Sequence, residues 1–488
     1  MGNQIMNKAS QSLKEKIKSC SDLKRSAVIL TALYLIAFYS IFRANFNYLD
    51  DLGRKHSGYH GWLDWSRWFT QIFSNFLHAD LYLADISPLP QWIACILMAA
   101  GGAVLLKIFG NGKKIGVISI IAASLAGVTP YFLGIISYKY DSPYMAFSFF
   151  VSVLPFLFYQ KKKRIYMPVS CICLVLMCTS YQASSGIYPL LTLFLAARDI
   201  NMGKKIRDGV RFVLTSVISY VVSLGGYWLI LMRPNEASVF SWRQLLEGAF
   251  FQKYLIFISQ INADFKMSWK ILILLLGLTF VIAFVAGSRI NRGVALILCI
   301  AELFLGSFFC LGINLFLDIE KYDARAMYGV GVFLSVMGIS ISFICAKWYW
   351  NVICMLLFWC FFTFSFSYGN ALAVQQSYLD YRIQLVAGDL NSLDIMNTDR
   401  TKRVQIIGDI GLSPVIENMS EGFEMLNRLI PSEFSAGYWG EYYFMNYFDI
   451  PNIERSDENL DISQLPVLKN TMYHVIYGNE DSIVVALK

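Results

Sequence analysis

Two consecutive aspartates, Asp50 and Asp51, follow the first long apolar run of the chain, which spans residues 26–42. Carboxylates at a bilayer surface cost free energy and are usually kept for a function. A carboxylate within hydrogen-bond reach of a hydroxyl group can accept its proton while that oxygen forms a new bond. Because adjacent carboxylates repel each other, one of the two can have a raised pKa. The alternative is that the pair belongs to a solvated turn or caps a helix.

Three arginines are candidates for holding an anionic group beside this pair. Arg54 and Arg67 lie in the same polar segment, and Arg325 lies in "YDARAMYG", just before a later apolar run. The planar guanidinium group binds phosphate oxygens through two parallel hydrogen bonds. Arg325 also has two structural alternatives, as an interfacial anchor or as an ion-pair partner of Asp323.

Two histidines, His56 and His60, lie four residues apart beside the acidic pair, a spacing that could ligate a metal ion. No clear third ligand accompanies them, so we expect no metal site. Contact with a substrate, or an ordinary role in the loop, fits both histidines better.

The elements that must position these residues are membrane helices. Hydrophobic residues make up 56% of the 488 residues and charged residues only 15%, whereas a soluble protein carries about 25% charged residues. About eleven apolar stretches approach the length of roughly 17–25 residues that a spanning helix needs. They cover approximately residues 26–44, 88–109, 115–135, 143–160, 165–182, 184–198, 210–232, 269–288, 293–315, 327–346 and 349–370. The fifth and sixth are short, and a re-entrant hairpin is an alternative there.

Clusters of lysine and arginine predict the orientation of these spans. They lie before the first span and after the even-numbered spans, so all of them fall on one side, which is the cytoplasmic side. An odd number of spans then places the C-terminus on the periplasmic side, together with the acidic pair. The positive charge is therefore a topology signal, and the sequence has no folded basic domain to bind nucleic acid.

This topology divides the chain into three parts. Residues 1–25 form a cytoplasmic segment, residues 26–370 an all-α transmembrane domain, and residues 371–488 a periplasmic domain. Two large periplasmic loops interrupt the transmembrane domain, at residues 44–87 and 233–269.

Two patterns predict structure outside the spans. The C-terminal part has strand-like runs at residues 403–410 and 482–488, with helix-like stretches between them, which predict a small α/β domain. In the first loop, apolar residues at helical spacing predict an amphipathic helix that lies in the headgroup plane or packs on the membrane domain. These residues are Trp62, Trp65, Phe69, Ile72, Phe73, Phe76 and Leu77.

The layout of the chain resembles the GT-C class of membrane glycosyltransferases. The shared features are the long first periplasmic loop, its acidic pair, its amphipathic helix and the many spans. More narrowly, four motifs look like those of the bacterial and phage-encoded O-antigen glucosyltransferases that change serotype, the type II glucosyltransferases. They are "NYLDDLGR" (47–54), "GWLDWSRW" (61–68), "DISPLPQW" (85–92) and "DARAMYGVGVF" (323–333).

This resemblance implies a reaction. Such enzymes take glucose from the lipid undecaprenyl-phosphate-glucose and attach it to a sugar of the O-antigen. The transfer takes place at the periplasmic face of the bacterial inner membrane and modifies the lipopolysaccharide. A flippase and a polyprenyl-phosphate glucosyltransferase are then the expected functional partners.

The resemblance also implies roles for residues. Asp50 is the expected general base, as the first acid of the pair is in the wider class, and Asp51 is the second choice. Arg325 is expected to bind the donor phosphate, assisted by Arg54 or Arg67. A lipid phosphate leaves readily, so one base and one or two cations suffice for a single inverting displacement, without metal or other cofactor. Weaker candidates for contacting the acceptor are His56, His60 and Asp64.

Two other classes of protein stay open. A flippase for lipid-linked glycans would place charges at mid-membrane in broken helices, usually with internal repeats, and neither pattern is evident. An O-antigen polymerase or ligase commonly carries its large periplasmic loop late in the chain, and residues 233–269 keep that class open.

Overall fold

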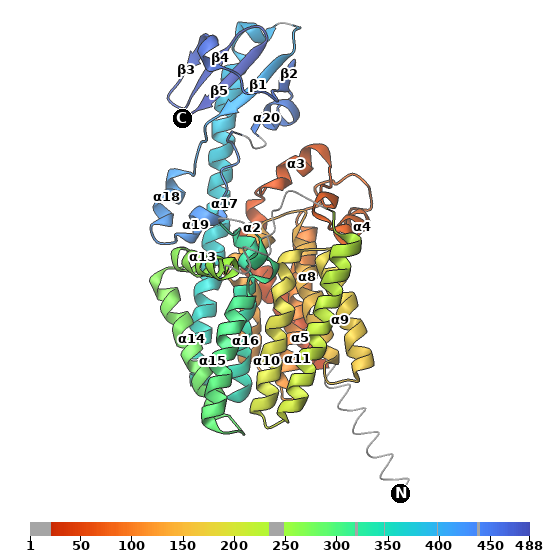
Figure 1. Cartoon of the computed structure of the whole chain (residues 1–488). Helices are drawn as coiled ribbons and strands as arrows, with labels where there is room; N and C mark the ends of the chain where they lie inside the picture. The colour runs from red at the N-terminus through yellow and green to blue at the C-terminus, as the bar shows by residue number, and fades with distance from the viewer. Residues whose placement is uncertain (1–20, 234–247, 318–320, 346, 398, 437–439) are drawn as a thin grey trace.

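The protein consists of a bundle of apolar helices and a small sheet that stands beyond one end of it (Figure 1). The structure is a computed structural model. It describes residues 21–233, 248–317, 321–345, 347–397, 399–436 and 440–488. Most of the expected cytoplasmic segment and residues 234–247 of the second expected loop therefore lie outside the described residues.

The N-terminal part of the chain contributes a helix over residues 21–37 and then three short helices at one end of the bundle. These are α2 (Tyr39–Ala44), α3 (Asp50–Ser57) and α4 (Trp68–His78), with the 3-10 turn η1 (Leu63–Trp65) before α4. Figure 1 shows α3 and α4 at the same end of the bundle as the sheet. The acidic pair and the C-terminal domain therefore share one end of the molecule.

The bundle is built from helices that precede residues 234–247 and helices that follow them in the chain. The first group is α5 (Leu89–Gly110), α6 (Val117–Val128), α7 (Pro130–Ile136), α8 (Ser142–Val153), η2 (Leu154–Phe158), α9 (Lys163–Cys178), η3 (Gln182–Gly186), α10 (Ile187–Asn201), α11 (Ile206–Gly226) and η4 (Tyr227–Leu231). The second is α13 (Ala249–Asp264), α14 (Met267–Ala286), α15 (Arg292–Phe309), η5 (Gly312–Phe316), η6 (Ala324–Met327), α16 (Gly329–Ile344), η7 (Trp348–Asn351) and α17 (Val352–Asn391).

Within the described residues, six helices are long and apolar enough to cross a membrane, or seven if α6 and α7, bent by 63°, form one broken span. These helices make the chain a membrane protein. The expected count of about eleven is not confirmed. The expected fifth and sixth spans are α9 and α10, with only 16 and 15 residues, which is shorter than a helix that crosses a bilayer. The expected fourth span, α8 with η2, is also a shorter apolar helix.

Helix α17 connects the bundle to the C-terminal domain. It has 40 residues and runs without a break through residue 370, where the sequence turns polar and a domain boundary was expected. Its first half packs against α2, α6 and α14 in the bundle. Its second half contributes Leu379, Ile383, Val386 and Leu390 to the core under the sheet. The change in polarity marks the end of the apolar environment and not the end of the helix.

The C-terminal sheet has five strands in the order β2-β1-β5-β4-β3. The two strands expected from the sequence are β1 and β5, which pair in parallel at the centre of the sheet. β2 adds a parallel edge, whereas β3 and β4 add an antiparallel hairpin beside β5. The small C-terminal sheet is therefore confirmed. The strands are β1 (Lys402–Ile407), β2 (Ile453–Arg455), β3 (Val467–Asn470), β4 (His474–Gly478) and β5 (Ser482–Leu487).

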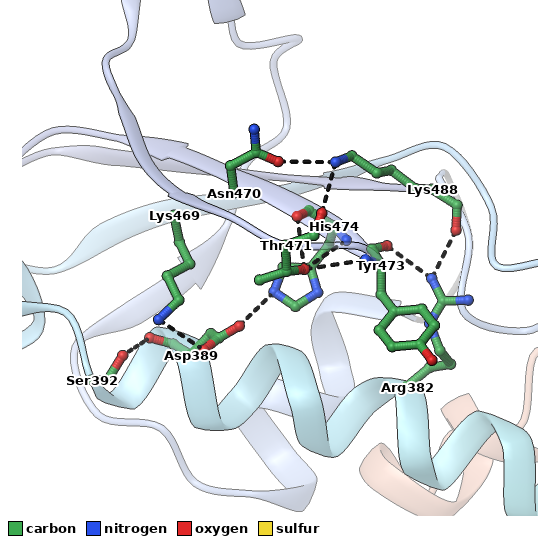
Figure 2. Close-up of polar contacts among 9 residues, drawn as sticks. All are labelled: Arg382, Asp389, Ser392, Lys469, Asn470, Thr471, Tyr473, His474 and Lys488. Carbon is green, nitrogen blue, oxygen red and sulfur yellow. Dashed lines mark hydrogen bonds and ion pairs between the residues drawn. The ribbon is translucent and has the colours of Figure 1, made fainter.

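Polar contacts fasten this sheet to the last turns of α17 (Figure 2). Arg382 donates hydrogen bonds to the carbonyl oxygens of Tyr473 and Lys488, at 2.9 and 2.8 Å. Nearer the end of the helix, Asp389 lies 3.0 Å from His474 Nε2 and 3.4 Å from Lys469 Nζ. These contacts reach β3, the beginning of β4 and the end of β5, so they hold the antiparallel side of the sheet on α17.

The segment between β1 and β2 returns from the sheet to the bundle. It contains α18 (Pro414–Ser420), α19 (Met425–Leu429), α20 (Gly440–Tyr442) and the π-helical turn η9 (Tyr443–Tyr447). Met425, Leu426 and Leu429 of α19 are fully buried in the core of the bundle. The C-terminal part therefore contacts the membrane domain directly, in addition to its connection through α17.

The amphipathic helix expected in the first loop is α4, but it begins later than the pattern indicated. Trp62 lies before it and is buried in a small cluster with Leu83, Tyr140 and Tyr144. Within α4, Ile72 and Phe76 are 69% and 79% exposed. One side of the helix thus packs on the bundle, and the other presents apolar side chains outward.

Candidate active site

The acidic pair forms the first turn of α3. The backbone N–H of Asp51 donates to the carbonyl oxygen of Tyr48 at 3.1 Å, which closes a tight turn before the helix. Carboxylates in the first turn of a helix are favoured by the helix dipole. The N-cap residue of α3 is Leu49, and no side chain forms a capping hydrogen bond there, so the pair lies inside the first turn and does not cap the helix. The surroundings distinguish the two residues.

Asp51 is enclosed by backbone donors and has no exposed surface. Its Oδ2 accepts hydrogen bonds from the backbone N–H groups of Tyr48 and Lys139, at 3.0 and 2.9 Å. Its Oδ1 accepts from the N–H of Tyr140 at 3.4 Å. Burial raises the pKa of Asp51 to about 7, although these N–H groups and Lys139 favour the charged form. Asp51 therefore has a structural position, joining α3 to the segment between α7 and α8.

Asp50 has the opposite surroundings. Its side chain is partly buried, and among the described residues it has no hydrogen-bond or ion-pair partner. Burial raises the pKa of Asp50, as does the negative charge of Asp141, while Arg325, Arg54 and Arg67 lower it. The fold thus brings all three arginines expected from the sequence into the electrostatic surroundings of the first acid of the pair. A carboxylate with a raised pKa and no fixed partner is suited to accept a proton.

Arg325 reaches this site from η6, before α16. Its Nη1 donates to the Tyr138 hydroxyl at 2.5 Å, and its guanidinium carbon lies 4.9 Å from the centre of that ring. Nη2 lies 3.7 Å from the exposed carboxylate of Asp323, so the ion pair expected as an alternative is present but long. An exposed pair of this kind contributes little stability. Among the described residues, the Tyr138 hydroxyl is therefore the hydrogen-bond partner of this guanidinium group, and its Nη2 has only the long ion pair.

The guanidinium group of Arg54, in contrast, forms several contacts within the protein. Its Nε and Nη2 lie 3.1 and 3.4 Å from the two carboxylate oxygens of Asp141. Its Nη1 donates to the carbonyl oxygens of Tyr59 and His60, and its guanidinium carbon lies 4.3 Å from the centre of the Trp62 ring. With both charges buried, this pair holds the first loop against the start of α8.

Asp141 is a site residue that the sequence analysis missed. It also accepts a hydrogen bond from the indole N–H of Trp62, and its charge acts on Asp50. The signal was present in the sequence, because "KYDSP" (139–143) places an acid and a lysine directly before an apolar run. Ionisable groups at the end of a membrane span cost free energy and are usually kept for a function.

Lys139 connects two of the sequence motifs. Its buried Nζ donates to Asn47 Oδ1 at 2.8 Å and lies 3.7 Å from Asp85. Asn47 begins "NYLDDLGR" and Asp85 begins "DISPLPQW". The two motifs therefore meet at the segment that also binds Asp51.

Arg67 is directed toward η3, the short connection between the expected fifth and sixth spans. Its Nε donates to Gln182 Oε1 at 3.3 Å, and its guanidinium carbon lies 5.1 Å from the centre of the Tyr181 ring. Among the described residues, its two terminal nitrogens have no hydrogen-bond partner. Arg67 can therefore bind a further anionic group.

The weaker candidates are not brought together. His60 Nε2 lies 2.8 Å from Asn75 Oδ1, whereas the His56 ring faces the Tyr447 ring of η9, 6.2 Å between centres. Asp64 is exposed in η1. Within the described ranges, no group of three or more His, Cys, Asp or Glu side chains could hold a metal ion.

The fold and the site define a helical membrane protein with several arginines and a carboxylate that has no partner in the described part of the chain, at one end of its bundle. Residues 39–339 match the family described as Glucosyl transferase GtrII, so the chain belongs to that family and is a glycosyltransferase. The matched segment contains Asp50, Asp141 and Arg325, but not the C-terminal sheet.

One curated relative is similar over most of its length. It is described as an uncharacterized 55.3 kDa protein in the gtrB 5′ region of Salmonella phage P22. It is 22% identical over 430 residues, which are 83% of this chain and 86% of the relative. No solved structure matches the chain.

Proposed function

We propose that the protein transfers glucose from undecaprenyl-phosphate-glucose to a hydroxyl group of an O-antigen sugar, at the periplasmic face of the bacterial inner membrane. Membership of the GtrII family supports glucosyl transfer as the reaction. The observation that carries the proposal is Asp50, a partly buried carboxylate without a partner among the described residues, whose pKa is lowered by the charges of Arg325, Arg54 and Arg67 and raised by burial.

In the proposed reaction, the acceptor hydroxyl oxygen attacks the anomeric carbon of glucose. The bond between this carbon and the phosphate oxygen breaks as the new carbon–oxygen bond forms, and its electron pair stays on the lipid phosphate. Asp50 accepts the hydroxyl proton, so that the attacking oxygen does not carry a positive charge. A single displacement of this kind inverts the configuration at the anomeric carbon.

The departing phosphate gains negative charge and needs fixed positive charge beside it. Arg325 is the proposed main contact, because its Nη2 is held only by a long ion pair to exposed Asp323. Arg67 assists with its terminal nitrogens. Arg54 is held by Asp141 and by backbone carbonyl groups, so it contributes through its charge and through the position of α3.

The two substrates must reach the site from different environments. A lipid donor needs access from the bilayer, and a polar glycan needs access from water. The exposed Ile72 and Phe76 of α4 offer an apolar surface beside α3, along which the donor chain can approach. The ring of His56 in α3 lies 6.2 Å from the exposed ring of Tyr447 in η9, between centres, and we propose that the acceptor binds beside these two rings.

The test is a transfer assay with purified protein in lipid nanodiscs. Undecaprenyl-phosphate-[14C]glucose and isolated O-antigen are the substrates, and UDP-[14C]glucose replaces the lipid donor in a parallel reaction. We expect label in the glycan only with the lipid donor, and NMR of the product should show the inverted anomer. Transfer from UDP-glucose alone, or a retained anomer, would refute the proposed donor or mechanism. Movement of the lipid across liposomes without glycosyl transfer would favour a flippase instead.

A further inference from the structure

The residue before Asp50 has a backbone conformation that most side chains avoid. Leu49 has φ 53° and ψ −109°. These angles are close to the values of about +60° and −120° at the second residue of a type II′ turn, where glycine is preferred. A side chain in such a region costs on the order of 1–3 kcal/mol and stays there only when its surroundings hold it.

Two contacts from one distant segment hold this turn. The backbone N–H of Leu49 donates to Glu433 Oε1 at 2.7 Å. The hydroxyl of the preceding residue, Tyr48, donates to the carbonyl oxygen of Leu429, also at 2.7 Å. Residues 429–433 are the last residue of α19 and the four residues after it, in the C-terminal part of the chain. The turn is therefore held from outside the segment that contains the acidic pair.

The holding segment is itself fixed on the bundle. Leu429 is buried in the bundle core. Arg428 forms a hydrogen-bonded ion pair with Asp264 at the end of α13, and Asp264 also accepts from the Tyr131 hydroxyl at 2.8 Å. Because these contacts fix residues 428 and 429, the Glu433 carboxyl group has a defined position relative to α3.

Glu433 is almost completely buried, with 1% of its surface exposed. Its second carboxyl oxygen, Oε2, is also buried and has no hydrogen-bond partner among the described residues. Burial raises the pKa of Glu433 well above its usual value, and the Leu49 N–H and Lys139 only partly oppose this effect. Glu433 therefore holds the turn as a hydrogen-bond acceptor, and its negative charge is not required.

We infer that Glu433 is a positioning residue for glycosyl transfer, which holds Leu49 in its left-handed conformation and thereby sets the direction of the Asp50 carboxylate. The inference rests on the proposed role of Asp50 as the base. It assigns a function in the reaction to the C-terminal part of the chain, beyond the residues that the family match covers.

The proposed role of Glu433 requires that Leu49 keep its positive φ. Without the acceptor of Glu433, the turn relaxes toward negative φ, and the carboxylate of Asp50 moves away from the acceptor hydroxyl. A displacement of about 1 Å at a reacting group can cost 10²-fold in rate. Glycine at position 49 adopts positive φ without steric cost, so it should restore the active conformation when Glu433 is absent.

The experiment compares kcat and the donor KM of four variants in the nanodisc assay. Glu433→Ala should lower kcat about 10- to 100-fold with little change in the donor KM. Glu433→Gln keeps a neutral acceptor and should recover kcat at least tenfold relative to Glu433→Ala. The double variant Leu49→Gly/Glu433→Ala should also recover part of the loss.

Glu441→Ala is the matched control. Glu441 is also buried, and it accepts a backbone hydrogen bond from Ile406 at 3.0 Å inside the C-terminal domain, whereas Glu433 accepts from Leu49. It should lower the melting temperature without a selective loss of kcat. Wild-type kcat in Glu433→Ala would overturn the inference, and so would equal losses in Glu433→Ala and Glu441→Ala. A fully active Asp50→Asn would instead refute the proposed base, so the two failures are distinguishable.

Discussion

The Asp51 carboxylate lies 2.9 Å from the backbone nitrogen of Lys139 and accepts its hydrogen bond. This contact joins the beginning of α3 to the segment between α7 and α8, from which Tyr138 contacts Arg325 and Asp141 contacts Arg54. The carboxylate of the neighbouring Asp50 has no partner in the ranges that the structure describes. Two consecutive acids thus have separate roles, one in the structure and one in the proposed reaction.

The first prediction concerns Asp50→Asn. The amide preserves the shape of the side chain but cannot accept the proton, so kcat should fall about 10²- to 10⁴-fold. The melting temperature in detergent should stay close to that of the wild type, because the carboxylate has no partner among the described residues. Substantial O-antigen modification by this variant, at equal protein level, would contradict the role of Asp50 as base.

The second prediction is that Asp51→Asn acts mainly on stability. Asparagine has only one acceptor oxygen. Its NH₂ group would face a backbone N–H group that donates a hydrogen bond to the Asp51 carboxylate in the wild type. A buried donor left unsatisfied costs about 1–3 kcal/mol. Thermal unfolding and the yield of folded protein should both decrease. A variant of wild-type stability without activity would mean that Asp51, and not Asp50, takes part in the chemistry.

The third prediction concerns the donor phosphate. Arg325→Lys should be impaired because an ammonium group cannot reproduce the two-pronged contact, and Arg325→Ala should be worse. The loss should affect the donor KM or kcat, while the apparent affinity for the acceptor glycan stays nearly unchanged. Asp323→Asn serves as the control, since it removes only the long, exposed ion pair. Full activity of Arg325→Ala would transfer the role to Arg67.

The fourth prediction tests the buried ion pair between Arg54 and Asp141. Asp141→Ala leaves the Arg54 guanidinium buried without its charge partner, and breaking a buried pair in this way typically costs 3–5 kcal/mol. We expect a large decrease in the melting temperature and in protein yield. Asp64→Ala, at an exposed position of the same region, should have little effect on either. Equal stability of the two variants would show that the pair does not hold the first loop.

The fifth prediction is the pH dependence of transfer. Burial and the charge of Asp141 raise the pKa of Asp50 above its usual value, more than the arginines lower it. The base acts in its charged form, so kcat/KM should be full at high pH and should fall as the pH decreases through this raised pKa. The acidic limb should therefore lie above about pH 4, the value of an ordinary aspartate. A flat profile down to pH 4 would contradict this environment for Asp50.

Much of the architecture was predictable from the sequence because it depends on local composition. Apolar stretches identify a membrane protein whatever their neighbours are, and the strand-like runs at residues 403–410 and 482–488 correctly predicted β1 and β5. The number of spans was not predictable. Helices of 15 or 16 residues, such as α9 and α10, are too short for a regular span, yet their composition alone resembles one. Likewise, the loss of hydropathy at residue 370 does not end α17, because its polar half packs under the sheet.

For the site, the sequence by itself determined which side chains could do chemistry: an acidic pair outside a span and three arginines. Only the tertiary structure distinguished the surroundings of Asp50 and Asp51, because the donors that enclose Asp51 include the backbone N–H groups of residues 139 and 140, which no side-chain pattern reveals. The same holds for Glu433, which meets Leu49 from the far end of the chain. Hydrogen bonds and burial depend on distances in space, and the fold sets those distances between segments that the sequence separates.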